Sequence, residues 1–344
     1  AVSITCCNKA LPPKRCKTLG ILLFMRVPLP AAMTTTSTNA MNLFPFIAGI
    51  INQLHTRFAL VAKLLALGFL VSLSACSLLI TGYNQAPSLL IFSWVNPHLD
   101  LNSEQDKQLR ADLQVLHQWH RQQQLPVYAD IFQKVAVLAP KEMTGPQICS
   151  LFDEFKDTLA PLSQQMSPAI ARLALKLTPA QLQRLEQQYD KDNRDYRKEW
   201  KLDASADKQL QVEADKGIEN AERWYDRLDK KQKALVKQLA KDSQFDLQKS
   251  WGERLRRQQD TVSTLERIAK SQQGLAWAQQ EVTALLNRSL LNSPDEAYRA
   301  YVEMRKDINC EAAAQLHNST SAAQREFTVK TLKAYEADIR ALVK

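Results

Sequence analysis

The chain has 344 residues, is 45% hydrophobic and contains six Trp, so it holds enough apolar side chains for a core and is not intrinsically disordered. Its formal net charge of +9 is misleading, because seven of the 45 basic residues and none of the 36 acidic residues lie in residues 1–75. The rest of the chain carries about +2, which excludes a nucleic-acid-binding body.

An apolar segment within the first 75 residues predicts secretion. Residues 64–73 read LLALGFLVSL, follow Arg57 and Lys63, and precede small residues. The segment is too short to span a bilayer, which takes about 20 apolar residues, but it has the pattern of a cleaved signal peptide. We therefore assign residues 41–75 to a signal peptide and residues 1–40 to an upstream extension or an over-called start.

The end of this segment, Leu73-Ser74-Ala75-Cys76, resembles the bacterial lipobox. The resemblance implies that the signal peptidase recognises Leu73, Ser74 and Ala75, and that Cys76 becomes the acylated first residue. Acyl chains of this kind anchor a soluble domain to a membrane without a spanning helix. Ser77 follows the cysteine in place of Asp, which implies the periplasmic face of the outer membrane. The alternative is an ordinary signal peptide whose cleavage site happens to precede a cysteine.

Residues 76–100 are expected to form the lipidated N-terminus, a tether and the first structured segment. Within them, residues 89–95 (LLIFSWV) have two interpretations. They lie in the membrane interface with Trp94 as an anchor, or they pack into the bundle as its first helix. We favour packing, because the helices that follow need an apolar partner.

Residues 101–344 are predicted to form a single all-helical periplasmic domain. Glycine is rare after Cys76, while Leu, Ala, Gln, Lys and Glu are abundant, which is typical of helices. Helix-capping patterns recur at Ser103, Thr144, Thr178 and Ser293. Apolar residues follow a helical period, and alternating strand patterns are absent. The prediction is an all-α, irregular bundle of about nine to eleven helices, several of them 20 residues or longer.

Three predicted helix starts are similar to one another. The segments that begin at Leu101, Leu177 and Leu228 share Leu, a cap residue, two variable positions and Gln. Their spacings of 76 and 51 residues are unequal, so they do not form a repeat array.

Two cysteines remain in the mature chain once Cys76 is acylated. Because the expected compartment is oxidising, Cys149 and Cys310 are predicted to form a disulfide across a separation of 161 residues. The alternative is a pair of buried free thiols.

Candidate sites for other chemistry are few. His117 and His120 have a spacing that can hold a metal ion if His98 or Asp112 approaches, although packing at the edge of an apolar stripe explains them as well. No activated nucleophile and no phosphate-binding glycine loop is recognisable, so we expect neither an enzyme nor a cofactor other than the lipid on Cys76.

Charged residues are mostly expected to be solvated. Arg254, Arg256 and Arg257 form a basic spot that either meets lipid phosphates or acidic partner segments, or simply favours solubility. The adjacent Asp153 and Glu154 are expected on an exposed helix surface.

Several motifs are scattered along the mature chain: the lipobox and residues 83–87, 119–121, 125–126, 177–181, 317–320 and 335–338. Together they resemble a Gram-negative family of helical lipoproteins of unknown function. The resemblance implies anchorage and an all-helical fold, and no activity. Residues 177–181 are also similar to the Leu-Thr-x-x-Gln motif of periplasmic proteins of the Spy and CpxP kind.

The expected function is that of a non-enzymatic outer-membrane lipoprotein whose helical body binds envelope proteins, as a chaperone-like holder or as an assembly or scaffold factor. The alternative is a metal or envelope-stress sensor that uses His117 and His120. The sequence does not determine the oligomeric state.

Overall fold

The computed structural model describes residues 82–343, and this range contains helices joined by short connections and no strand. The predicted all-α bundle of nine to eleven helices is confirmed, because eleven α-helices of 13 residues or more, α4 to α14, make up most of the described chain. The short segments α2, η2 and α3 precede α4, and the π-helical segments η3 and η4 follow α4 and α12. None of the helices in residues 82–343 has the length and apolar character needed to cross a membrane.

The bounds of the elements follow the chain. The first segment comprises α2 (Ala86–Leu90), η2 (Ile91–Val95) and α3 (Asn96–Leu99). The helices that follow are α4 (Ser103–Trp119), η3 (His120–Gln124), α5 (Leu125–Leu138), α6 (Gly145–Asp157), α7 (Leu159–Ala174), α8 (Pro179–Glu199) and α9 (Ala206–Tyr225). The last are α10 (Lys230–Asp242), α11 (Leu247–Lys270), α12 (Gly274–Leu286), η4 (Asn287–Leu291), α13 (Glu296–Asn318) and α14 (Ala322–Val343).

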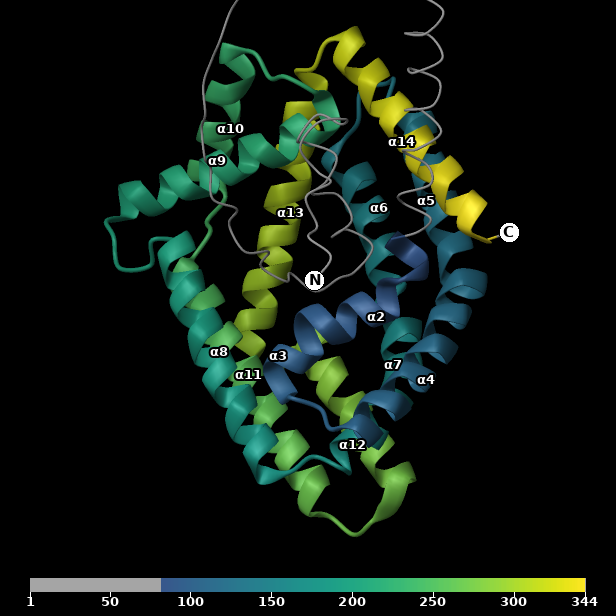
Figure 1. Cartoon of the computed structure of the whole chain (residues 1–344). Coiled ribbons are helices and arrows are strands. Elements are labelled where there is room, and N and C mark those ends of the chain that lie inside the picture. The colour runs from purple at the N-terminus through teal and green to yellow at the C-terminus, as the bar shows by residue number, and fades with distance from the viewer. Residues whose placement is uncertain (1–81, 344) are drawn as a thin grey trace, which may run out of the picture. The chain divides into compact units, whose positions relative to one another are not determined.

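The chain from Ala86 onward forms one compact unit, and its hydrophobic interior is divided into several clusters. The largest cluster joins the first segment to α4, α7, α8, α11 and α12, and its members Ile91, Ile268 and Val282 are completely buried. Smaller clusters lie between α5 and α14, between the end of α8 and the start of α11, and between α9 and α10. The helices pack mainly in pairs, α5 with α14, α6 with α13, α7 with α12 and α9 with α10 (Figure 1).

The first segment packs into this bundle, as the favoured interpretation of residues 89–95 expects. Ile91 and Val95 are buried in the largest cluster, and Trp94 packs against it from the edge. The indole ring of Trp94 stacks on the imidazole of His98 with centroids 4.5 Å apart. The opposite side of the segment is open to solvent, since Phe92 is 74% exposed.

Two of the four predicted helix caps are confirmed, and two lie at a neighbouring residue. Thr144 and Thr178 cap α6 and α8 with the expected capping box. The cap of α4 is Asn102 and not Ser103, because the box needs the glutamine three residues after the cap. The cap of α13 is Asp295 and not Ser293, whose hydroxyl instead donates to the buried carboxylate of Glu253.

Two capping glutamines meet across the start of α4 and the start of α8. The side-chain amides of Gln105 and Gln181 donate to each other's Oε1 at 3.0 and 2.7 Å. Gln105 also donates to the carbonyl of Lys176 at 2.7 Å, and Gln181 donates to that of Asp100 at 3.3 Å. Both glutamines are buried, so these bonds satisfy polar groups that would otherwise be costly to bury.

The same arrangement recurs between α10 and α14. Gln232 and Gln324 exchange amide hydrogen bonds at 2.8 and 2.9 Å. Gln232 donates to the carbonyl of Ser319, and Gln324 donates to that of Arg227. The pattern of a cap residue followed three positions later by Gln therefore marks helix starts, and at four of them the glutamines bond in pairs, whereas Gln147 at the start of α6 bonds only its own cap.

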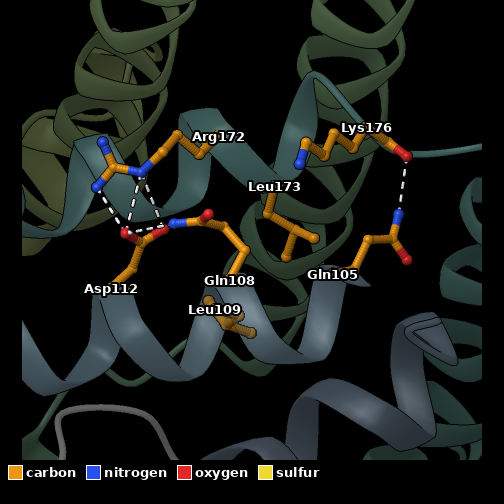
Figure 2. Close-up of a pocket in the computed structure, with 7 residues that line it drawn as sticks. All are labelled: Gln105, Gln108, Leu109, Asp112, Arg172, Leu173 and Lys176. Carbon is orange, nitrogen blue, oxygen red and sulfur yellow. Dashed lines mark hydrogen bonds and ion pairs between the residues drawn. The ribbon is translucent and has the colours of Figure 1, made fainter. Parts of the chain in front are cut away.

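An ion pair between the buried Asp112 and the partly exposed Arg172 joins α4 to α7, on the same face of α4 as Gln105 (Figure 2). The carboxylate of Asp112, which is 8% exposed, accepts hydrogen bonds from Nε of Arg172 at 2.9 and 3.0 Å and from Nε2 of Gln108 at 3.2 Å. The hollow lined by these side chains has a volume of only about 10 Å³. That space holds roughly one water molecule, so this junction is structural.

We predict that Gln181→Ala lowers the free energy of unfolding by about 1–3 kcal/mol, because it removes both buried hydrogen bonds that Gln105 and Gln181 exchange. Gln147 is the matched control, since it is exposed and its side-chain hydrogen bonds within residues 82–343 are to its own cap, Thr144. Gln147→Ala should cost less than about 1 kcal/mol. Urea unfolding followed by circular dichroism measures both, and equal losses would contradict the role of the pair.

Candidate protein-binding groove

Helices α6 and α13 lie side by side (Figure 1). Their contacts step in opposite directions along the chain, which makes the helices antiparallel: Cys149 with Cys310, Asp153 with Lys306, and Lys156 with Glu303. A groove with a volume of about 720 Å³ runs along one face of this pair. It is the larger of the two hollows described here.

Cys149 and Cys310 form the disulfide that the cysteine count predicts. This disulfide lines the groove. The two Cα atoms are 5.4 Å apart, and Cys310 is only 5% exposed. The bond connects residues 161 positions apart and fixes α6 against α13. It therefore determines the separation of the two walls.

The groove is lined by five carboxylates and a single cation, Lys306. Lys306 is engaged with Glu303 at 3.0 Å and with Asp153 at 3.3 Å, and these carboxylates raise the pKa of its ammonium group. The lining carboxylates are those of Asp153, Glu154, Asp157, Asp307 and Glu311.

Only two of these five carboxylates have a cation beside them. Asp153 pairs with Lys306, and Glu154 pairs with Lys134 of α5. Among residues 82–343, no Lys, Arg or His forms an ion pair with Asp157, Asp307 or Glu311. The groove therefore has a net negative charge, although the chain after residue 75 carries about +2.

A glycine lets the two helices approach at one end of the groove. A Cβ atom at Gly145, the first residue of α6, would lie 2.1 Å from Oε2 of Glu311 and 3.3 Å from its Cα. The carboxylate of Glu311 thus sits against the N-terminal turn of α6, where a negative charge is favourable. A side chain at position 145 would push this end of the groove apart.

The His-Asn segment at the end of α13 holds the loop that leads into α6. His317 donates from Nε2 to the carbonyl of Lys141 at 2.8 Å and accepts at Nδ1 from the hydroxyl of Tyr225 at 2.9 Å. Burial lowers the pKa of the His317 imidazole, which fits this neutral form. Asn318 bonds both the N–H and the carbonyl of Met143 at 2.9 Å.

These bonds give residues 317–320 a structural role. Neither Ser319 nor Thr320 caps the last helix, α14. The hydroxyl groups of both residues donate to carbonyls at the end of α13. Ser321 accepts from the N–H of Gln324 and caps α14.

The histidine pair proposed for metal binding lies at the end of α4 and the start of η3. Burial, and then the positive charge of His117, lowers the pKa of His120 to about 4. Of the candidate further ligands, Asp112 is bonded to Arg172, and His98 is bonded to the carbonyl of Trp94 and to Asp192. Among residues 82–343, no group of three or more His, Cys, Asp or Glu side chains has an arrangement that could hold a metal ion.

The three arginines of the predicted partner surface have contacts within the chain. Nε of Arg254 donates to Asn193 at 2.8 Å, and Arg256 and Arg257 both bind Glu253. Burial raises the pKa of the Glu253 carboxyl, but hydrogen bonds from the two arginines outweigh it and leave this pKa below its usual value. A partner that binds here would compete with these ion pairs.

The proposed lipidation residue Cys76 and the recognition residues Leu73, Ser74 and Ala75 lie outside the described residues. Their assignment stays a prediction from the sequence.

The groove was not predicted from the sequence, because Asp153 and Glu154 were expected on an ordinary solvated surface. The sequence feature that indicates the groove is the spacing of acidic residues from the two cysteines. Asp153 is four residues after Cys149, and Asp307 is three residues before Cys310, so each lies on the same helical face as its cysteine. Once the two cysteines pair, carboxylates at these spacings must gather beside the disulfide.

A model of a family of unknown function, DUF6279, matches residues 97–299, which is more than half of the chain. The match includes helices α4 to α12 and ends just after the start of α13. No curated protein and no solved structure matches the chain. The expected resemblance to a helical family of unknown function is confirmed, and the lipobox lies outside the matched residues.

Reduction of the disulfide should lower the free energy of unfolding by up to about 5 kcal/mol, because the bond closes a loop of 161 residues in the unfolded chain. Urea unfolding with and without reductant measures the loss. The variant with both Cys149→Ala and Cys310→Ala is the control, and reductant should not change its unfolding midpoint. Two alkylatable thiols at these positions in the unreduced protein would contradict the bond.

Acid should destabilise the fold through His120. Its pKa is about 4 when folded and about 6.5 when unfolded, so between these values the unfolded chain binds more protons. Stability due to this group is present above pH 6.5 and is lost as the pH falls towards 4, by up to about 3 kcal/mol. His120→Gln should flatten this part of the stability profile relative to the parent, whereas His117→Gln should retain most of it. An unchanged slope in His120→Gln would contradict the burial of this imidazole.

Proposed function

The chain belongs to the family of unknown function DUF6279. From its sequence and the geometry of its folded part, we propose that it is a non-enzymatic outer-membrane lipoprotein that binds envelope proteins. Its body faces the periplasm, and acyl chains on Cys76 hold it at the membrane. The signal-peptide pattern of residues 41–75 and the lipobox-like Leu73-Ser74-Ala75-Cys76 support the anchor.

The observation that carries the binding proposal is the acidic groove between α6 and α13. Helix α6 has 13 residues and is therefore about 20 Å long, which matches an extended peptide of about six residues. Three carboxylates in the groove have no ion pair within residues 82–343, so a segment with several Lys or Arg side chains is the complementary ligand. They are Asp157, Asp307 and Glu311.

Exposed apolar side chains also occur on these two helices, outside the lining of the groove. Phe152 on α6 is 54% exposed, and Val302 and Met304 on α13 are 42% and 37% exposed. Exposed large apolar residues next to charged ones are typical of surfaces that hold chain segments of another protein.

The groove is present before any partner binds. The disulfide fixes the two helices, and His317 and Asn318 hold the loop before α6. A preformed site loses less conformational entropy on binding than one that must first become ordered. A preformed groove therefore favours reversible binding of unstructured segments. These segments belong to many client proteins if the protein is a holder, or to one partner if it is an assembly factor.

The test is photo-crosslinking in the bacterial envelope. A benzoylphenylalanine at Ser150, which lines the groove, should crosslink proteins through segments rich in Lys or Arg. The same group at the exposed Lys237 of α10 is the control and should give no such products. A broad set of exported proteins indicates a holder, and one stoichiometric product indicates an assembly factor.

Charge-neutralising variants test the chemistry of the site. The triple variant Asp157→Asn, Asp307→Asn and Glu311→Gln should reduce crosslinking at Ser150 about 10-fold or more, if each exposed ion pair contributes about 0.5–1 kcal/mol. The matched control, Asp207→Asn, Glu296→Gln and Glu326→Gln, removes the same charge from exposed positions outside the groove and should leave crosslinking unchanged. Equal crosslinking in the two variants would rule out the groove as the binding site.

A further inference from the structure

The first segment presents an apolar pair to solvent on a rigid support. Phe92 is 74% exposed, more than any other large hydrophobic side chain in residues 82–343, and Leu89 is 41% exposed. The spacing of three residues in a helical segment places these two side chains on one face. The opposite face is buried in the main core through Ile91 and Val95.

The segment is held so that it cannot turn to bury Phe92. His98, which is only 5% exposed, bonds the carbonyl of Trp94 at 2.7 Å and the carboxylate of Asp192 on α8 at 3.1 Å. Trp94 stacks on His98 and packs against the main core. Burial of Phe92 by rotation would expose Ile91 and break these contacts, so the phenyl ring stays in solvent unless another surface covers it.

Two guanidinium groups contact the first segment, one near each end. Arg110 of α4 donates to the hydroxyl of Ser88 at 3.3 Å and also binds Asp106. At the other end of the segment, Arg184 of α8 donates to the carbonyl of Pro97 at 3.2 Å. Both side chains are more than 40% exposed, so their guanidinium groups can reach phosphate oxygens.

The position of the pair in the chain determines which surface is close to it. Leu89 is 13 residues after Cys76, so an extended tether between them spans at most about 45 Å, and a bent one spans less. An acylated Cys76 therefore keeps this face near the bilayer at a high effective concentration. Aromatic and aliphatic side chains on a segment that also contacts exposed arginines match the boundary between headgroups and acyl chains.

We propose that Leu89 and Phe92 insert into the bilayer that holds Cys76, and that the first segment thereby sets the orientation of the helical body on the membrane. The proposal rests on the lipid anchor of the proposed function and adds a second, non-covalent contact with phospholipid.

The test uses the lipidated full-length protein in vesicles of phosphatidylethanolamine and phosphatidylglycerol. A nitroxide is attached to Phe92→Cys and, as the matched control, to Val137→Cys on α5, because Val137 is 66% exposed and lies on a helix of a different core cluster. At position 92, collisions with oxygen relative to those with a water-soluble nickel chelate should be several-fold more frequent than at position 137.

The other outcomes are distinct. Equal, water-like accessibility at positions 92 and 137 would overturn the proposal. A label at position 92 that is shielded from both oxygen and the nickel chelate would overturn it in favour of a protein contact, with a partner or with a second copy of this chain. Mass spectrometry of the peptide that begins at Cys76 tests the anchor separately, and a peptide without acyl chains would remove the anchor and this inference with it. Crosslinking at Ser150 reports on the groove independently.

Discussion

The attachment of α6 to α13 is the constraint on which the groove and its surroundings depend. Only one residue of α6, Gly145, is buried, so hydrophobic burial alone holds this helix weakly. The disulfide and the hydrogen bonds from His317 and Asn318 hold α6 in place, as the burial of apolar side chains would do for a helix in a core. The disulfide and these hydrogen bonds are all made by residues of α13. Leu316 of the same helix also packs into the cluster between α9 and α10. Further contacts join α6 to α5, including the ion pair of Glu154 with Lys134 and the stacking of Phe155 on Tyr128.

Charge explains why the groove stays open. Carboxylates are costly to remove from water, and those that line the groove outnumber the cations around them, so the two helices cannot close over them without a partner. The net charge of the folded body, about +2, does not reveal this arrangement. Binding specificity here depends on the local distribution of charge, which a sum over the whole chain averages away.

The first segment and the groove have separate tasks in the proposed function. The first segment is fixed by His98 between Trp94 and Asp192, and it presents Phe92 outward. The groove is built from α6 and α13, which belong to neither the first segment nor the main cluster that holds it. A protein organised in this way can be held at a membrane by one surface and bind a protein segment with another.

The sequence by itself determined the features that depend on neighbouring residues or on simple counts. Helical periodicity and capping patterns act within one or two turns, so the all-α class and the helix starts at Thr144 and Thr178 were predictable, and the cysteine count predicted the disulfide. Only the tertiary structure decided which distant residues meet. It pairs Gln105 with Gln181, bonds Asp112 to Arg172 and gathers the carboxylates of α6 and α13 in one groove. These contacts join residues 60 to 160 positions apart, and no local pattern encodes them, because they depend on how whole helices pack.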